Sequence, residues 1–169
     1  MSEQYDVMQV CENGHQITAS YNNNPERRKK FCQDCGAPTY TNCPSCTKEI
    51  QGAQITVRKS LLDARIGRVT KVPQYPVDVP KFCENCGEPY PWTRKKIQTA
   101  IQILTEFGDL NEEEKKTIEQ DVENIAKDVP EAELSARRVK RIWEKCSRAG
   151  YAVIMEFASR TAAQILKNP

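Results

Sequence analysis

The chain has 169 residues, of which 38% are hydrophobic and 28% charged, and 25 basic residues against 23 acidic ones give a net charge of +2. This length accommodates one ordinary domain or two small ones. The sequence excludes a membrane-spanning helix, because no apolar run approaches the roughly 18 residues that such a helix needs. The first six residues, MSEQYD, carry neither a basic region nor an apolar stretch, so we expect no secretory signal and a cytoplasmic location.

Four closely spaced pairs of metal-ligand residues occupy the first half of the chain. They are Cys11 and His15, Cys32 and Cys35, Cys43 and Cys46, and Cys83 and Cys86. In a reducing cytosol, paired cysteines indicate metal binding rather than disulfides, because two intervening residues let a tight turn aim both sulfurs at one ion. Each pair supplies half of a tetrahedron, so the four pairs predict two structural zinc ions. Iron also fits a four-cysteine site, but the single histidine of the chain favours zinc.

The ligand pairs can combine in two ways. Sequential pairing places the first two pairs on one ion and the last two on the other. Alternating pairing joins the first pair to the third and the second to the fourth, as in the cross-brace of ubiquitin-ligase-like fingers. We favour the sequential arrangement because each site then closes a shorter loop. His15 is the weakest predicted ligand, since a lone histidine beside a turn glycine can also be a surface residue, and Cys146 is left over as a buried structural cysteine.

The texture of the sequence changes at Pro91-Trp92-Thr93. Most prolines and glycines, and every cysteine but one, precede this point, whereas helix formers with apolar residues at 3.6-residue spacing follow it. We therefore predict two domains, a tandem zinc-ribbon module over residues 1–92 and a helical module over residues 93–169, with Thr93 as the first helix cap. The first module has too few apolar residues to fold without an additional cross-link, and bound metal would supply that cross-link.

The second half is predicted to form an all-α helical hairpin or bundle. Asn111 is expected to cap the second helix, which Pro130 terminates, and Gly108 and Gly150 are expected to end the first and third helices. The third and fourth helices can alternatively form one kinked helix. The expected apolar stripes are Ile97, Ile101, Leu104 and Phe107; Ile118, Val122, Ile125 and Val129; Leu134, Val139, Ile142, Trp143 and Cys146; and Val153, Ile154, Phe157, Thr161 and Ile165.

The first half of the chain carries a series of recognisable motifs: Tyr5-Asp6-Val7, the CENGH of residues 11–15, FCQDCGA of 31–37, CPSC of 43–46, Ile50-Gln51-Gly52 and FCENCGEPYPW of 82–92. With these motifs the chain resembles a bacterial family of small cytosolic proteins of unknown function that carry paired zinc ribbons and a helical tail. The resemblance covers most of the chain. It implies zinc at the four pairs and sequential ribbons, and it implies no reaction. The stretch between Cys46 and Cys83 is long for a plain ribbon loop.

No active site is predicted. A catalytic zinc keeps an open coordination position, whereas each predicted ion has four protein ligands. The sequence carries no Gly-rich phosphate loop, no Gly-x-Ser-x-Gly elbow and no His-Glu-x-x-His motif. We therefore expect a protein that is not an enzyme, with no catalytic residue, no organic cofactor and no small-molecule substrate.

The sequence indicates the binding partner less clearly than it indicates the metal sites. For a nucleic-acid partner, the best candidates for phosphate contacts lie in one basic segment, Arg27, Arg28, Lys29 and Lys30. The overall charge weakens this interpretation, because seven thiolates and two zinc ions would bring the loaded chain from +2 to near −1. Residues 111–129 hold seven acidic and three basic side chains, whereas residues 134–148 hold one acidic and six basic side chains. The opposite charges of these two predicted helices can therefore compensate each other.

The leading hypothesis is a non-enzymatic zinc-binding adapter whose helical module binds another protein or a second copy. A cluster of apolar residues that nearly encircles one helical turn favours such docking: Tyr151, Val153, Ile154, Met155 and Phe157. One alternative is a zinc-ribbon nucleic-acid-binding protein that uses residues 27–30, and another is a cross-brace ubiquitin-ligase-like finger.

Overall fold

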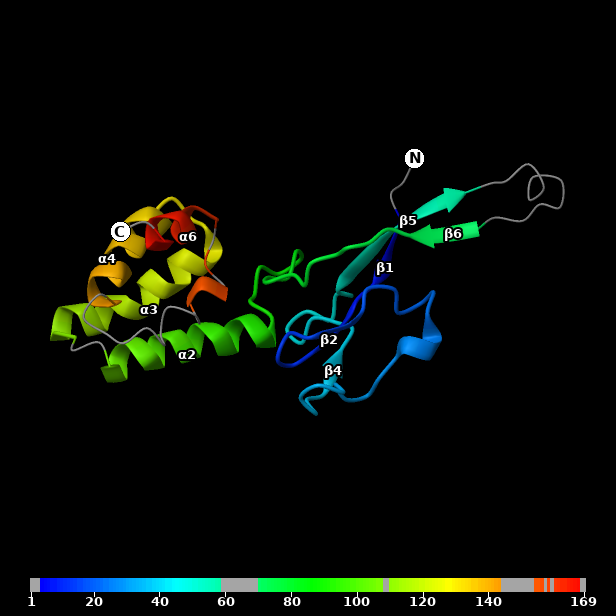
Figure 1. The fold of residues 1–169 in the computed structure, drawn as a ribbon, viewed down its shortest axis with the longest axis horizontal. Coiled ribbons are helices and arrows are strands. Elements are labelled where there is room, and N and C mark those ends of the chain that lie inside the picture. The colour runs from blue at the N-terminus through cyan, green and yellow to red at the C-terminus, as the bar shows by residue number, and fades with distance from the viewer. Residues whose placement is uncertain are drawn as a thin grey trace. The chain divides into compact units, whose positions relative to one another are not determined.

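The computed structural model of the protein describes residues 4–58, 70–107, 110–143, 154–156, 158 and 160–167. They divide into two compact units, Met1–Trp92 (unit 1) and Thr93–Pro169 (unit 2). Unit 1 carries the strands, and the α-helices begin at its last two residues and continue through unit 2 (Figure 1).

Two three-stranded antiparallel sheets form the framework of unit 1. The elements are β1 (Gln4–Val7), β2 (Gln9–Cys11), β3 (Gln16–Thr18), the short 3-10 helix η1 (Pro25–Arg27), β4 (Thr39–Tyr40), β5 (Gln51–Arg58) and β6 (Thr70–Pro73). One sheet has the strand order β3-β2-β4 and the other has the order β1-β5-β6. In the second sheet Tyr5 lies opposite Gln54, and Thr56 lies opposite Val72.

The long stretch between Cys46 and Cys83 forms the β5–β6 hairpin, and β5 also pairs with β1. Strand β1 precedes the first ligand pair, whereas β5 and β6 lie between the third and the fourth. The structure adds a feature to the predicted tandem ribbons: one sheet combines a strand that precedes the first ligand pair with two strands that follow the third pair. Alternate burial along β5, with Ala53 and Ile55 buried, is the physical signature of a strand that covers a core on one face.

The core of unit 1 is small and includes two of the predicted metal ligands. Its buried members are Met8, Val10, Ala19, Cys43, Ile50, Ala53, Cys83, Tyr90 and Trp92. The rings of Tyr90 and Trp92 stack with their centroids 4.7 Å apart, and the indole N–H of Trp92 donates to the carbonyl of Pro80 at 2.8 Å. A Cβ atom at Gly14 would lie 3.0 Å from Cβ of Trp92, so this ring also lies against the turn that follows Cys11.

Gly52 marks the closest approach of three backbone segments. A Cβ atom here would lie 2.2 Å from the carbonyl oxygen of Ala19, 2.8 Å from the carbonyl carbon of Val7 and 2.9 Å from the carbonyl oxygen of Asp6. The neighbouring Ala53 N–H donates to the carbonyl of Ala19 at 2.7 Å, and this hydrogen bond fixes the distance between the two backbone segments. Only glycine fits a backbone packed this closely.

Asp6 is a buried carboxylate that holds the turn after Ala19 in place. Its side chain is 4% exposed and accepts hydrogen bonds from the backbone N–H groups of Val7 at 2.7 Å, Asn22 at 3.0 Å and Asn23 at 3.2 Å. The side-chain amide of Asn23 donates to the same carboxylate. A carboxylate that accepts several N–H groups is held by charge-assisted hydrogen bonds.

We expect Asp6→Asn to lower the free energy of unfolding by about 2 kcal/mol or more, because the new NH₂ group would face donors and leave one unsatisfied. Denaturant unfolding of the metal-loaded protein measures this change. Asp78→Asn, at an exposed position, removes the same charge as a control. Equal loss of stability in the two variants would contradict the role assigned to Asp6.

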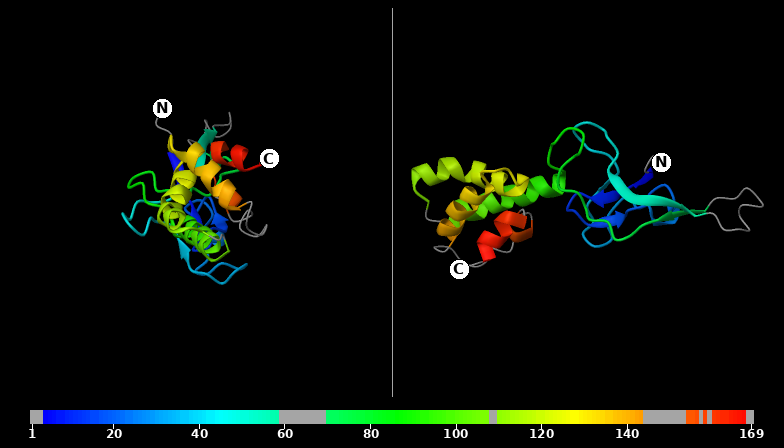
Figure 2. Two further views of the ribbon diagram at one scale, coloured as in Figure 1. Left: turned by 90° about the vertical axis from the view of Figure 1, so that its left-hand side faces the viewer. Right: turned by 90° about the horizontal axis from the view of Figure 1, so that it is seen from above.

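The helices are α2 (Pro91–Phe107), α3 (Glu112–Lys127), α4 (Ala132–Trp143) and α6 (Arg160–Lys167). Helix α4 lies against both α3 and α6 (Figures 1 and 2). The side chains buried in unit 2 include Ile97, Ala100, Leu104, Ile118, Val122, Ile125, Ala136, Val139, Ile142, Ile154, Ala162 and Leu166. Most of these residues follow the predicted 3.6-residue spacing.

The predicted start of the second helix is confirmed. The Asn111 side chain accepts hydrogen bonds from the N–H groups of Glu113 and Glu114, and the Glu114 carboxylate accepts the N–H of Asn111 at 3.0 Å. This reciprocal pair is a capping box. The helix ends at Lys127, three residues before the expected breaker Pro130, and the next residue, Asp128, takes a left-handed φ of 55°.

Two details of the predicted helices are wrong. Helix α2 begins at Pro91 rather than after a Thr93 cap, because proline at the first helical position lacks only an N–H that would have no partner there. Leu134 is 52% exposed, since the buried face of α4 runs through Ala132, Ala136 and Val139 and its 3.6-residue period bypasses position 134.

Several residues of the predicted stripes and helix ends lie outside the described residues: Gly108, Cys146, Gly150, Val153 and Phe157. The same holds for the side chains of Phe107, Trp143 and Thr161, and for the question of whether the third and fourth helices are continuous.

The acidic helix and the basic helix do meet. Asp121 of α3 is 3% exposed and accepts hydrogen bonds from the Ser135 hydroxyl at 2.7 Å and from Arg138 Nη1 at 3.4 Å. The other ion pairs that involve α3 or α4 among the described residues stay within one helix, such as Arg137 with Glu133. The charge match between the helices therefore includes a buried contact at Asp121.

Candidate metal centres

The last three ligand pairs lie in three copies of one hairpin turn. In each copy the carbonyl of the first cysteine accepts the N–H of the residue four positions later, and the N–H of the same cysteine donates to the carbonyl five positions later. The N–H groups that donate to the cysteine carbonyls are those of Gly36, Thr47 and Gly87, at 2.8–2.9 Å. The carbonyls that accept the cysteine N–H groups are those of Ala37, Lys48 and Glu88, also at 2.8–2.9 Å. Flanking residues close the turns as bridges: Phe31 with Pro38, Asn42 with Glu49, and Phe82 with Pro89. This shared geometry turns both sulfurs of each pair to one side.

The residue after the second cysteine has a left-handed backbone in all three turns. It is Gly36 in the first, with φ 68°, Gly87 in the third, with φ 72°, and Thr47 in the second, with φ 62°. A β-branched residue in this region is strained by roughly 1–2 kcal/mol, whereas glycine adopts it freely.

We expect Thr47→Gly to raise the free energy of unfolding of the metal-loaded protein by about 1 kcal/mol, because the strain disappears and the backbone hydrogen bonds of the turn stay. The reciprocal variant Gly87→Thr should lower it by a similar amount, since a Cβ at Gly87 meets no atom within 4 Å and only the backbone is strained. Thermal unfolding midpoints compare the two variants. Shifts in the same direction would contradict this assignment of strain.

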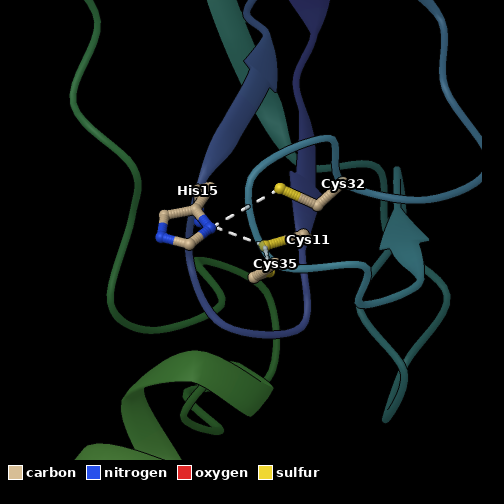
Figure 3. Close-up of side chains that lie close together, drawn as sticks. All are labelled: Cys11, His15, Cys32 and Cys35. Atoms are coloured by element: carbon tan, nitrogen blue, oxygen red, sulfur yellow. Dashed lines mark hydrogen bonds between the residues drawn. The ribbon is translucent and has the colours of Figure 1, made fainter.

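The first group combines one of these turns with the turn between β2 and β3. Cys11 ends β2, and its sulfur accepts the backbone N–H of His15 at 3.3 Å. Cys11 Sγ lies 3.8 Å from Cys35 Sγ, and His15 Nδ1 lies 3.5 Å from Cys32 Sγ. Figure 3 shows the four side chains converging, with a ring nitrogen of His15 turned toward the sulfurs. The arrangement offers three sulfurs and one imidazole nitrogen.

The second group consists of two of the repeated turns. Cys43 Sγ lies 3.8 Å from Cys86 Sγ, and Cys46 Sγ lies 3.6 Å from Cys83 Sγ. Within each group all four ligand atoms lie within 4.8 Å of one another. A regular tetrahedron with a metal–sulfur bond of about 2.3 Å has sulfurs about 3.8 Å apart. The spacing of the sulfurs therefore fits a tetrahedral ion of the size of zinc.

The groups follow the sequential combination of ligand pairs. Cys11 and His15 lie with Cys32 and Cys35, and the remaining four cysteines lie together. The alternating combination, which a cross-brace requires, does not occur among the residues that the structure describes. Cys146 lies outside those residues, and the basic residues 27–30 lie in η1 and the segment after it rather than in either group.

Backbone N–H groups lower the pKa values of three of these thiols and desolvation raises them, whereas the neighbouring sulfurs lower the pKa of Cys35 and Cys83 and raise that of Cys86. The N–H of Ala37 and the side-chain amide of Asn13 lower the pKa of Cys35 to about 6. At Cys83 burial raises the pKa, but the N–H groups of Cys86 and Asn85 lower it to about 6. At Cys86 the N–H of Glu88 lowers the pKa, but partial desolvation and the three other sulfurs raise it to about 12. Thiolates this close together repel one another, so the four sulfurs cannot all be negatively charged without cost. A bound cation would remove that repulsion.

Two asparagines support the ligand groups, and the sequence analysis missed them. Asn13 Nδ2 donates to Cys35 Sγ at 3.4 Å, and the Asn85 side chain hydrogen-bonds to Cys46 and lowers its pKa, after the larger effect of the Lys48 N–H. In both groups an asparagine two residues after a cysteine reaches a sulfur of the other pair. The repeated tripeptide Cys-Glu-Asn at 11–13 and 83–85 is the signal that could have found them.

Each group has a buried side and an open side. Cys11 and Cys32 are buried in the first group, whereas His15 and Cys35 are exposed. In the second group Cys43 and Cys83 are buried and Cys86 is exposed. An ion held here would join the core on one side and remain within reach of a chelator on the other.

Each of the two sets of four cysteine and histidine side chains could hold one metal ion, and a closed set of four protein ligands suits a structural role. The chain belongs to a family of uncharacterized proteins conserved in bacteria (DUF2321), which matches residues 4–166. This confirms the bacterial family that the motifs indicated. No curated protein and no solved structure matches the chain. Within the described part of the chain, no helix has the length and apolar character that crossing a membrane requires.

Proposed function

We propose that the protein is a non-enzymatic zinc-binding adapter. Two zinc ions hold the ribbon-like turns of unit 1 in shape, and the helices of unit 2 bind another protein or a second copy of the chain. The observation that carries the proposal is the closure of both ligand groups, in which four ligand atoms lie within 4.8 Å of one another. Zinc is the metal that best suits a mixed set of three thiolates and an imidazole, and it suits four thiolates equally well.

The same closure supports a structural rather than a catalytic role. A catalytic zinc needs a position for water or substrate, and four protein ligands complete the tetrahedron of each ion. The only histidine of the chain belongs to the first group, so it is not available elsewhere as a general base.

Support for the docking surface on unit 2 is narrower than the apolar cluster at residues 151–157 suggested. Ile154 is fully buried and Met155 is half-buried, while Tyr151, Val153 and Phe157 lie outside the described residues. The exposed side chain of Leu134 on α4 is the described apolar residue of unit 2 that faces solvent most fully. A protein contact at α4 would cover it.

Elemental analysis and X-ray absorption spectroscopy of the purified protein test the metal assignment. We expect two zinc ions per chain, with seven sulfur ligands and one nitrogen ligand in total over the two ions. The matched variant His15→Cys should keep two ions and replace the nitrogen by sulfur. Iron in place of zinc, or shells rich in oxygen, would overturn the proposal.

Recovery of partners from bacterial lysate, before and after nuclease treatment, tests the adapter role. We expect a protein partner that survives nuclease treatment, or self-association of the purified chain in sedimentation, and Leu134→Glu should weaken that contact. Loss of every partner after nuclease treatment, from a chain that remains monomeric, would count against the adapter.

A further inference from the structure

A hollow of about 520 Å³ lies beside the basic segment of unit 1. Arg28, Lys29 and Lys30 line it together with Tyr21, and the remaining lining residues are Gln9, Thr39 and Thr41. No lining residue is acidic. We call this feature the basic hollow. Its composition fits an anion, because three cations and several hydroxyl and amide groups face the same space.

Buried hydrogen bonds fix the backbone of the basic hollow. Gln9 is 6% exposed, and its amide donates to the carbonyl of Lys29 at 2.7 Å and to the Thr39 hydroxyl at 2.9 Å. The same side chain accepts the N–H of Lys29 at 3.1 Å. The chain that carries the two lysines is therefore held in place, and their ammonium groups project from a fixed base.

The guanidinium of Arg28 is held by Tyr21. Its Nε donates to the carbonyl of Tyr21 at 2.8 Å, and its Cζ lies 4.3 Å from the centre of the Tyr21 ring. This contact orients the group and leaves its two terminal nitrogens available for a phosphate. No salt bridge found among the described residues involves any of residues 27–30, so the local positive charge has no acidic partner there.

An exposed aromatic ring follows the basic segment directly. Phe31 is 63% exposed, although its backbone is fixed by the bridge to Pro38. A solvent-exposed phenylalanine is costly to hydrate and is well placed to stack on a flat apolar surface. Cations that track phosphates beside an aromatic ring are the combination that binds unpaired bases.

We propose that the basic hollow binds single-stranded nucleic acid. Arg28, Lys29 and Lys30 contact successive phosphates, and one unstacked base lies on the ring of Phe31. An unpaired strand fits better than a duplex, because an aromatic side chain can stack only on a base that is free of its partner. The inference goes beyond the proposed function, since zinc-dependent folding and a protein contact at unit 2 need no nucleic-acid surface.

Fluorescence anisotropy of a labelled single-stranded RNA of about twelve nucleotides, titrated with the metal-loaded full chain, tests the proposal. The length lies within the ~4–16 nucleotides that small single-strand-binding domains cover. We expect binding that weakens with salt. Lys29→Ala/Lys30→Ala should reduce the affinity at least tenfold and make the salt slope shallower by about 1.4, because two phosphate contacts are lost at ~0.7 each. Phe31→Ala should reduce it about tenfold with the slope unchanged, because stacking releases no counterions.

The control Lys115→Ala/Lys116→Ala removes the same charge from exposed positions of α3 and should leave the affinity within twofold. The zinc content of each variant shows that unit 1 is intact. An equal loss in the control, binding to a duplex as tight as to the single strand, or binding to anionic lipid vesicles without binding to RNA would each overturn the proposal.

Discussion

Cys43→Ser is expected to unfold unit 1 while leaving most of the helical signal intact. Cys43 is both a member of the second ligand group and a buried residue of the small core. A structural zinc contributes on the order of 10 kcal/mol, which is comparable to the whole stability of a domain, about 5–15 kcal/mol. The core of unit 1 cannot offset such a loss, because two of its own buried members are ligands.

Zinc content, near-ultraviolet circular dichroism and far-ultraviolet circular dichroism together measure this effect. We expect one zinc ion or none in the variant, and loss of the near-ultraviolet signal of the stacked Tyr90 and Trp92 rings. Exhaustive chelation of the unaltered protein should have the same effect, since each ligand group has an exposed side. Cys146→Ala serves as the control and should retain two ions. Unchanged metal content in Cys43→Ser, or a chain that keeps its near-ultraviolet signal after chelation, would contradict the expectation.

Gly52→Ala is expected to destabilise the metal-loaded protein by about 3 kcal/mol or more. The new methyl group would lie 2.2 Å from the carbonyl oxygen of Ala19, and its other near neighbours are also backbone atoms. Side chains can rotate away from an added methyl, but three hydrogen-bonded backbone segments cannot separate without loss of the β1–β5 pairing. The cost therefore exceeds that of ordinary overpacking, about 1–3 kcal/mol.

Gly36→Ala is the matched control for Gly52→Ala. Gly36 has a left-handed φ of 68°, and a Cβ atom there meets nothing within 4 Å, so the variant carries only backbone strain of roughly 1–2 kcal/mol. Denaturant unfolding at one fixed zinc concentration compares the two, because free metal itself shifts the apparent stability. A Gly52 variant no less stable than the Gly36 variant would refute the crowding at this position.

The two groups of candidate ligands were the most predictable part of the molecule, because Cys-x-x-Cys spacing constrains the local backbone wherever it occurs. The sequential combination was also predictable from loop length. The pairing of β1 with β5 was not, since a contact between residues 4–7 and 51–55 leaves no local pattern. The exposed Gln51 and the buried Gly52 also interrupt, at the start of β5, the alternation that residues 53–56 follow.

The helices show a similar division. Asn111 and the acidic residues after it predicted the α3 start because capping is a local interaction between residues three apart. Leu134 was misplaced because an apolar residue was assigned to the buried face without regard for the register that Ala132, Ala136 and Val139 define. Small residues such as these alanines carry little hydropathy signal, although they are the ones that let α4 approach its neighbours closely.

The order of the ligand pairs has a consequence for the growing chain on the ribosome. All four members of the first ligand group, and the whole β3-β2-β4 sheet, lie within the first 40 residues. Cys86, which completes the second group, emerges about 3–10 s after Cys35 at a synthesis rate of ~5–20 residues per second. The first ligand group can thus bind a metal ion while the second half of unit 1 is still being translated. At that stage the cysteines that complete the second group are not yet present to compete for the metal.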